Sequence, residues 1–372
     1  MKLLMVGPID TQGRYAGGIA QVMNSLIEKN EKFHESDVQV NWFNNFRIPR
    51  SQYGNGRMNL ENLINAGKIY FDLLKEIKEF QPDVLYYHAS VRLGLLKDLL
   101  VLSGVRKVKK VVHIHAAELK HILHGNRMLR QFTLYLLKHV PDHIVTLSAK
   151  TREELIREGI DQSRISVLYN FHTLAFTEED LERKIEASQK REGLNLLYLG
   201  SLNVQKGIID LLDSLKAVNA PCHLDIGGLP LDEKMRKTLE DKVDELPSGM
   251  VAMHGFVKGE QKEKLLYHAD VLILPSYAEG MPMVLLEAIA AGCGIVATAV
   301  GAVGEIFDNE NGAIIQPGNV QQLSESINAM ADGEKRALCM RINYEKSQNF
   351  SIDQFIHQII AICNQTASKP NG

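Results

Sequence analysis

The sequence is poor in cysteine and has no long apolar run. Its four cysteines lie far apart in 372 residues and form no Cys-x-x-Cys pair. This pattern argues against a disulfide framework or a cysteine-based zinc site and favours a reducing cytosol. No stretch approaches the roughly 18 to 20 uninterrupted apolar residues that a membrane-spanning helix needs. Residues 1–6 are too few for the apolar core of a signal peptide, so we expect them to form a buried strand.

A fixed-period repeat and low-complexity tracts are also absent from the sequence. Hydrophobic residues make up 45% and charged residues 23% of the chain, as in ordinary globular proteins. The length favours two domains, each with enough apolar residues to form a core.

The net charge of −3 indicates no nucleic-acid partner, but the charges are unevenly distributed. Residues 1–170 carry 24 Lys and Arg against 17 Asp and Glu, whereas the rest carries 18 against 28. The basic half predicts an anionic partner, such as a membrane surface or a phosphorylated acceptor. A solvated basic face explains the same excess equally well. A weak membrane contact would use a segment that mixes basic and apolar residues: Lys120, Arg127, Arg130 and Lys138 among Leu119, Ile122, Leu123, Met128, Leu129, Phe132, Leu136 and Leu137.

Apolar runs of strand length alternate with segments of helical spacing, which predicts parallel α/β layers. The charged segment 171–193 separates two halves, and Thr177 with Asp180 forms a capping-box signal for a solvated helix. A helical pattern closes the chain at residues 352–363. We expect strands at residues 2–7, 83–88, 111–115, 143–147, 164–168, 194–199, 223–226, 251–253, 271–274 and 295–298.

The most informative stretch, residues 274–294, begins where a buried strand ends. Open parallel sheets bind ligands at the carboxyl ends of their strands. A helix that begins near Met281, with Pro282 at its first position, would aim free backbone N–H groups at a ligand such as a diphosphate. Glu279 would lie beside this site, and Glu287 in the second turn would accept hydrogen bonds from two vicinal hydroxyls. Each glutamate alone is better explained as an ordinary carboxylate, but Glu287 stands among apolar residues, where an unpartnered charge is costly.

A second strand–turn–helix segment has its strand at residues 194–199, its turn at 200–207 and its helix from residue 208 onward. Lys206 would lie at the start of that helix, where a cation can neutralise a phosphate. Glycine-containing turns follow three other strands: Gly17-Gly18, Gly227-Gly228 and His254-Gly255-Phe256-Val257. Each of these turns is equally explained as an ordinary tight turn. Lys206 taken alone is also explained as a surface charge.

Histidines gather in the first half of the chain. His113 and His115 alternate on one expected strand and face the same side, and His121 and His124 lie three apart on a helical face. A zinc site is one interpretation, but no carboxylate or cysteine completes it at a usual spacing. His88, at the end of another strand, is expected to be structural or to face an acceptor.

Glu279 and Glu287 form an E-x7-E pair within E-G-M-P-x-x-x-L-E-A. This pattern resembles the signature of the retaining GT-B glycosyltransferases of family 4, also called glycosyl transferases group 1. The resemblance extends over nearly the whole chain and implies two Rossmann-like domains facing each other across a cleft. The acceptor domain would comprise residues 1–175 and the C-terminal helix at about 350–366, and the donor domain residues 176–349. The resemblance also implies a nucleoside-diphosphate sugar donor, with UDP favoured, no cofactor and no bound metal.

The same resemblance implies roles for single residues. Glu279 contacts the donor sugar, Glu287 binds the ribose hydroxyls, and His115 lies near the transferred sugar. Residues 200–207 resemble G-R-L-x-x-x-K-G, whose cations hold the diphosphate; Lys206 matches, but Ser201 stands where arginine is common. The implied catalytic residues are Glu279, His115 and Lys206, and the implied donor-binding residues are Gly17, Gly18, Ser201, Lys206, Gly227, Phe256, Val257, Glu279, Gly280, Met281, Met283, Val284 and Glu287.

The implied reaction transfers a sugar, with its anomeric configuration retained, to a hydroxyl of a bacterial surface-glycan or lipid-linked acceptor. We expect it in the cytoplasm or at the inner face of the cell membrane. Front-face substitution is favoured, and a covalent glycosyl–enzyme path remains open. Two other classes also remain open: another GT-B enzyme, such as a sugar-nucleotide epimerase or phosphorylase, and an inactive partner subunit that binds a nucleotide sugar.

Overall fold

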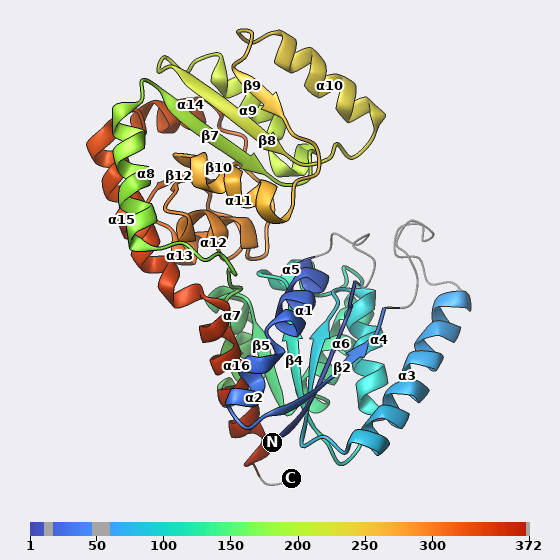
Figure 1. Ribbon diagram of the computed structural model, residues 1–372. Helices are drawn as coiled ribbons and strands as arrows, with labels where there is room; N and C mark the ends of the chain where they lie inside the picture. Colours follow the sequence, from blue (N-terminus) through green and yellow to red (C-terminus); the bar gives the residue numbers. More distant parts are fainter. Residues whose placement is uncertain (11–17, 47–59, 370–372) are drawn as a thin grey trace. The chain divides into compact units, whose positions relative to one another are not determined.

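The computed structural model describes residues 1–10, 18–46 and 60–369, and the chain divides into two compact units. Unit 1 comprises residues 1–170 and 352–372, and unit 2 comprises residues 171–351. Each unit contains one six-stranded sheet with helices packed against it (Figure 1). The parallel α/β layers predicted from the sequence are thereby confirmed.

The sheet of unit 1 is parallel throughout, with the strand order β2-β1-β3-β4-β5-β6. The central strand β3 is buried along its whole length. Helices cover both faces of such a sheet, so its central strands consist of continuous apolar runs rather than alternating ones. The strands are β1 (Lys2–Gly7), β2 (Gln39–Asn44), β3 (Val84–Ala89), β4 (Lys109–Ile114), β5 (His143–Thr146) and β6 (Ile165–Val167).

The C-terminal helix α16 (Ile352–Ala367) belongs to unit 1, although most of unit 2 precedes it in the chain. It packs against β3, β4 and α2, and it confirms the helical pattern predicted for this segment. The other helices of unit 1 are α1 (Gly18–Glu28), α2 (Asn30–Glu35), α3 (Leu60–Phe80), α4 (Leu93–Ser103), α5 (Leu119–Ile122), α6 (Arg127–His139), α7 (Ala149–Arg157) and the short 3-10 helix η2 (Gln162–Arg164).

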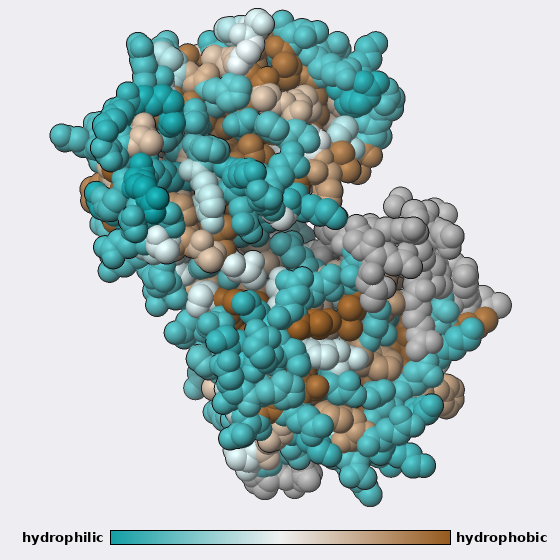
Figure 2. All heavy atoms as spheres, in the orientation of Figure 1, coloured by the Kyte–Doolittle hydropathy of each residue, from teal (hydrophilic) through white to brown (hydrophobic). Residues whose placement is uncertain are grey.

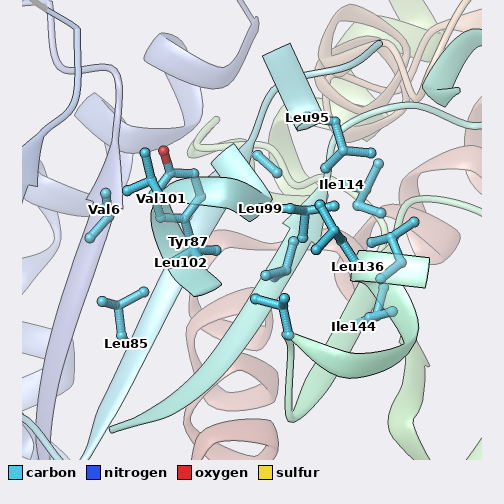
Figure 3. Packing of buried hydrophobic residues seen from close by; sticks show 14 of the residues in the cluster. Val6, Leu85, Tyr87, Leu95, Leu99, Val101, Leu102, Ile114, Leu136 and Ile144 are labelled. Atoms are coloured by element: carbon cyan, nitrogen blue, oxygen red, sulfur yellow. The ribbon is translucent and has the colours of Figure 1, made fainter. Parts of the chain in front are cut away.

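A large apolar cluster forms the core of unit 1 between the sheet and the helices α3, α4 and α6 (Figure 3). Leu85 and Tyr87 of β3 belong to it together with Leu99 and Leu102 of α4. The one hydroxyl group among these four side chains has a partner, because Tyr87 donates a hydrogen bond to Asp98 at 2.8 Å. Burial and the nearby Asp98 carboxylate raise the pKa of Tyr87. The tyrosine therefore stays protonated and packs as an apolar residue.

The sheet of unit 2 is also parallel, with the order β12-β11-β10-β7-β8-β9. Its central strand β10 is buried at every residue. The carboxyl ends of parallel strands share one edge of the sheet, so the loops after them are brought together. The strands are β7 (Leu194–Leu199), β8 (Cys222–Gly227), β9 (Val251–Met253), β10 (Val271–Leu274), β11 (Gly294–Thr298) and β12 (Ala313–Ile315).

Unit 2 begins with the solvated helix that its capping box predicted. Thr177 and Asp180 exchange hydrogen bonds at the start of α8, which confirms that prediction. The helices are α8 (Glu178–Lys190), η3 (Val204–Lys206), α9 (Ile208–Leu215), α10 (Glu233–Asp244), α11 (Gly259–His268), α12 (Met283–Ala290), α13 (Val303–Ile306), α14 (Val320–Ala329), α15 (Gly333–Ser347) and η4 (Gln348–Phe350).

Two strands were not predicted, and both lie at a sheet edge. β2 has a single buried residue, Phe43, so its apolar content is too low to stand out in the sequence. β12 has only three residues. Pairing with β1 and β11 makes these segments extended, and that pairing is not visible in their own residues. The ten predicted strands are confirmed, with ends that differ by at most two residues.

No helix among the described residues is long and apolar enough to cross a membrane. The 21 residues of α3 would suffice in length, but charged residues recur along it. Figure 2 shows hydrophilic residues over most of the visible surface, with hydrophobic residues in small groups between them.

Candidate active site

Helix α12 begins two residues after the predicted start near Met281. Pro282 is its N-cap residue rather than its first helical residue, with an extended backbone (φ −71°, ψ 120°). No side chain caps this helix end. No side chain therefore accepts a capping hydrogen bond from the backbone N–H groups of Met283 and Val284, the first two residues of the helix. The first turn of a helix carries partial positive charge, so this end suits an anionic ligand.

Glu279 and Lys206 form an ion pair in unit 2, although they lie 73 positions apart in the chain. Lys206 Nζ lies 2.7 Å from Glu279 Oε1, and Ser276 Oγ donates to the same oxygen at 2.7 Å. Only 9% of the Glu279 side chain and 29% of the Lys206 side chain are exposed, so water screens this pair only in part. The structure thus joins two of the predicted catalytic residues and adds Ser276, which the sequence analysis missed.

The backbone around Gly207 holds Lys206 in this place. The Asn203 side chain accepts a hydrogen bond from Lys206 N at 3.1 Å and closes the turn η3. Gly207 follows with a φ of +67°, which glycine adopts without strain. A Cβ at this position would collide with the carbonyl oxygen of Pro275, the residue that follows β10. Glycine therefore allows η3 to approach β10 closely enough for Lys206 to reach Glu279.

A second glycine supports the loop of Glu279 from the other side. Gly301 has a φ of +62°, and a Cβ there would collide with the carbonyl oxygens of Glu279 and Gly280. The next residue, Ala302, donates its N–H to Gly280 O at 2.9 Å. The turn after β11 thus holds the backbone of the Glu279 loop in place.

Glu287 is buried in the second turn of α12 and is only half satisfied. Lys262 Nζ of α11 lies 2.5 Å from its Oε1, and the glutamate side chain is 8% exposed. Its other oxygen, Oε2, is buried and has no hydrogen-bond partner among the described residues. An unpaired buried carboxylate oxygen costs free energy and marks a place where a ligand can donate a hydrogen bond. Lys262 was not predicted, because nothing distinguishes it from the other lysines of its polar helix.

Four further donor-binding candidates of unit 2, Ser201, Gly227, Phe256 and Val257, lie at or just after the ends of β7, β8 and β9. Gly227 ends β8, and a Cβ on it would lie 2.6 Å from a methyl group of Val257, so these residues pack closely. Gly200 N donates to Gly227 O at 3.0 Å and joins two of these loops. Phe256 is 53% exposed, and Ser201 is also exposed. Among the described residues, no side-chain hydrogen bond or ion pair joins them to the Lys206–Glu279 pair.

The predicted residues of unit 1 fall into a different group. Gly17 lies outside the described residues. Gly18 begins α1, and none of the described residues lies within 4 Å of a Cβ built there. His115 follows β4 and is half-buried, and desolvation lowers its pKa to about 3. His115 is therefore a neutral imidazole at physiological pH.

The cluster of histidines differs from the one considered in the sequence. His88, His113 and His115 place one nitrogen each within 4.8 Å of one another. His121 is not part of this group and lies 3.6 Å from Glu118, and His124 accepts a hydrogen bond from Asn126 N. The sequence predicted that His113 and His115 face the same side. Only the structure shows that His88, on the neighbouring strand, joins them.

Comparison with known proteins identifies the family. Residues 25–175 match the family described as Glycosyltransferase Family 4, and residues 179–347 match Glycosyl transferases group 1. The chain belongs to these GT-B glycosyltransferases, whose members typically retain the anomeric configuration. The resemblance drawn from Glu279 and Glu287 is thereby confirmed.

Several relatives carry informative names. The putative teichuronic acid biosynthesis glycosyltransferase TuaC of Bacillus subtilis is 27% identical over 265 residues, which are 68% of this chain and 63% of that protein. Lipopolysaccharide 1,6-galactosyltransferase of Escherichia coli K12 is 26% identical over 58% of this chain and 57% of its own. The chain thus spans less than two thirds of the length of these two relatives. The crystal structure of Anabaena Alr3699/HepE in complex with UDP shares the fold, with a TM-score of 0.74 at 18% identity over 98% of this chain and 100% of that one.

Proposed function

We propose that this glycosyltransferase moves a sugar from a nucleoside-diphosphate sugar, with UDP favoured, to a hydroxyl of a bacterial surface-glycan or lipid-linked acceptor. The observation that carries the proposal is the unpaired Oε2 of Glu287. A free carboxylate oxygen accepts hydrogen bonds, and the two adjacent hydroxyls of a ribose donate them. The names of TuaC and of the lipopolysaccharide galactosyltransferase support a surface-glycan acceptor. The UDP complex of HepE supports the nucleotide.

In this proposal, unit 2 holds the donor, and the diphosphate lies at the start of α12. The amides of Met283 and Val284 and the ammonium of Lys206 take up the charge that grows on the leaving diphosphate. Preorganised donors of this kind contribute on the order of 3 kcal/mol each to the transition state. Glu279 contacts the sugar, and we favour attack of the acceptor hydroxyl on the face from which the nucleotide leaves.

The direct test is a panel of nucleotide sugars, including UDP-glucose, with product analysis. A new glycoside with retained configuration supports the proposal. An altered nucleotide sugar would show an epimerase, and donor binding without turnover on any acceptor would show an inactive partner subunit. Free monosaccharide alone would indicate slow hydrolysis and would contradict transfer to the acceptors tested.

The reaction should not depend on a divalent metal. The charge of the diphosphate is offset by Lys206 and by the helix N-terminus, and no Asp-x-Asp stands at a strand end near this site. We therefore expect the initial rate in excess EDTA to stay within about twofold of the untreated rate, because a helix end and a cation replace a metal here. Complete loss of activity in EDTA that manganese restores would refute this expectation.

A membrane contact through unit 1 rests on a smaller surface than the sequence indicated. Five of the eight apolar residues predicted to take part lie in the core of unit 1: Leu119, Ile122, Leu123, Leu136 and Leu137. These five side chains therefore stabilise the fold of unit 1 and do not face a membrane. On α6, Met128 is 75% and Phe132 is 44% exposed. Arg130 is also on this helix, but it pairs with Glu158 at 2.5 Å, which reduces its attraction for lipid.

We propose that the exposed side of α6 binds anionic membranes weakly. Each basic residue near such a surface contributes about 1 kcal/mol, and salt screens that contribution. We expect the protein to float with anionic liposomes at low salt and to be released as the salt concentration rises. The double variant Met128→Ser/Phe132→Ser should float several-fold less, and Leu338→Ser, at an exposed leucine of unit 2, should behave as the wild type. Equal binding to neutral liposomes would contradict the proposal.

A further inference from the structure

Three histidines, two of them buried and one half-buried, lie at the carboxyl ends of two neighbouring strands of unit 1. His88 of β3 pairs directly with His113 of β4 in the sheet register. His115 follows two residues after His113, and side chains two apart along a strand face the same side. His88 is 1% exposed, His113 is fully buried, and His115 is half-buried. Of the three, His115 is thus the one with access to solvent or ligand.

The contacts within this group are specific. His88 Nδ1 lies 2.7 Å from His115 Nε2, and the two rings stack with centroids 4.9 Å apart. Tyr86 OH lies 3.0 Å from His113 Nδ1, and the His113 ring lies 4.0 Å from that of His115. The ring of His115 is therefore in contact with two other imidazoles. Among the described residues, His88 is its only hydrogen-bond partner.

These contacts determine where the protons lie. Burial lowers the pKa of all three histidines, so each ring is neutral and carries one N–H. His88 Nε2 is buried without a partner. A buried unpaired N–H is rarer in proteins than an unpaired acceptor, so the proton of His88 belongs on Nδ1. Nδ1 then donates to Nε2 of His115, and His115 carries its own proton on Nδ1.

We propose that His88 is a positioning residue for His115, which it holds in one ring orientation and in the Nδ1–H tautomer. His115 then presents a fixed N–H donor to an oxygen of a substrate bound at this edge of the sheet of unit 1. The contact with the substrate rests on the proposed function, whereas the hydrogen bond and the tautomer do not. Nothing in the sequence suggested this role, because His88 belongs to β3 and His115 follows β4, 27 positions further along the chain.

A metal bound by the three histidines is a competing explanation of the same cluster. Two imidazole nitrogens on one tetrahedral zinc ion, each about 2.0–2.1 Å from the metal, lie roughly 3.3 Å apart. The 2.7 Å between His88 Nδ1 and His115 Nε2 is instead a hydrogen-bond distance. The geometry therefore favours a hydrogen-bonded pair.

The first measurement is the tautomer of His115 in the protein labelled with ¹⁵N-histidine. Long-range ¹H–¹⁵N spectra separate Nδ1–H from Nε2–H rings, and the variant His115→Asn identifies the resonances. We expect Nδ1–H in the wild type. An Nε2–H ring in the wild type, or a shift of all three histidines on removal of metal, would overturn the proposal. This measurement of the tautomer requires neither a variant of His88 nor transferase activity.

The second measurement compares His88→Leu with His88→Asn. Leucine removes the hydrogen bond, whereas asparagine places an N–H donor near the position of Nδ1. A matched control is His143→Leu on β5, which removes another buried histidine of the sheet, one that bonds to Ser166 and not to His115. We expect His88→Leu to lower kcat about tenfold to a hundredfold with a smaller change in KM, because small misplacements of a contact residue have such effects. His88→Asn should recover most of the rate.

The outcomes distinguish this inference from the proposed function. A wild type without transferase activity would refute the proposed function and leave the tautomer measurement valid. An active enzyme in which His88→Leu keeps both the Nδ1–H tautomer and a kcat within twofold of the wild type would overturn the inference alone. An equal loss of kcat in His143→Leu would show a general effect of core damage and would also overturn it.

Discussion

Replacing Lys206 by alanine should lower kcat about tenfold to a hundredfold and change the donor KM much less. Lys206 is proposed to meet charge that grows as the diphosphate leaves, and only interactions that strengthen in the transition state increase kcat. A hydrogen bond to a charged group contributes roughly 1.5–3 kcal/mol, which corresponds to this range. The motif that residues 200–207 resemble has an arginine at the position of Ser201, so this chain lacks the second cation of that motif beside Lys206.

The ion pair with Glu279 makes a control necessary. Lys206 Nζ lies 2.7 Å from Glu279 Oε1, so the variant also leaves a poorly exposed carboxylate without its cation. If Lys206 served only to hold Glu279, the double variant Lys206→Ala/Glu279→Gln would be as active as Glu279→Gln alone. We expect a further loss instead, and a partial rescue of Lys206→Ala by Ser201→Arg.

Steady-state kinetics with a donor titration measure both parameters. Lys216→Ala is the matched control, because Lys216 makes an exposed ion pair with Glu245 in the same unit, and such pairs contribute little. We expect it to remain within twofold of the wild type. A change in KM alone for Lys206→Ala would show that the lysine does not stabilise the leaving group.

Replacing Glu287 by glutamine should raise the donor KM about tenfold to a hundredfold and leave kcat nearly unchanged. The ribose does not change during the reaction, so losing a contact with it removes uniform binding. The structure gives a reason for a large effect of so small a change. Lys262 lies 2.5 Å from Oε1 and will keep an amide oxygen there, which places the amide NH₂ where the free Oε2 now lies. The variant would present a donor to hydroxyl groups that need an acceptor.

Donor binding and thermal stability should be measured together for this variant. An exposed carboxylate, Glu240 on α10, offers the control Glu240→Gln, which should leave both the KM and the melting temperature unchanged. Nucleotide alone, such as UDP, should bind Glu287→Gln as weakly as the full donor does. Normal affinity for UDP would mean that Glu287 does not hold the nucleotide and that Oε2 has another role.

Much of the fold could be predicted from local patterns. The buried central strands are continuous apolar runs, and the capping box of α8 is encoded by Thr177 and Asp180 alone. The edge strands β2 and β12 could not be predicted, because their own residues bury little and their extended conformation comes from pairing with β1 and β11. The apolar residues of segment 119–137 could not be divided between core and surface before the helices α5 and α6 were placed on the sheet.

The sequence by itself determined the parallel α/β architecture and the membership of the family, and it marked Glu279, Lys206 and Glu287 as candidate site residues, because periodicity and a contiguous motif are local properties. The tertiary structure alone decided which groups these side chains meet. Lys206 reaches Glu279 across 73 positions through a close approach of two backbones at Gly207, and Lys262 reaches Glu287 from a helix without any motif. His88 contacts His115 only because β3 and β4 are neighbours in the sheet. Contacts between distant segments depend on packing and strand register, which no single stretch of the chain encodes.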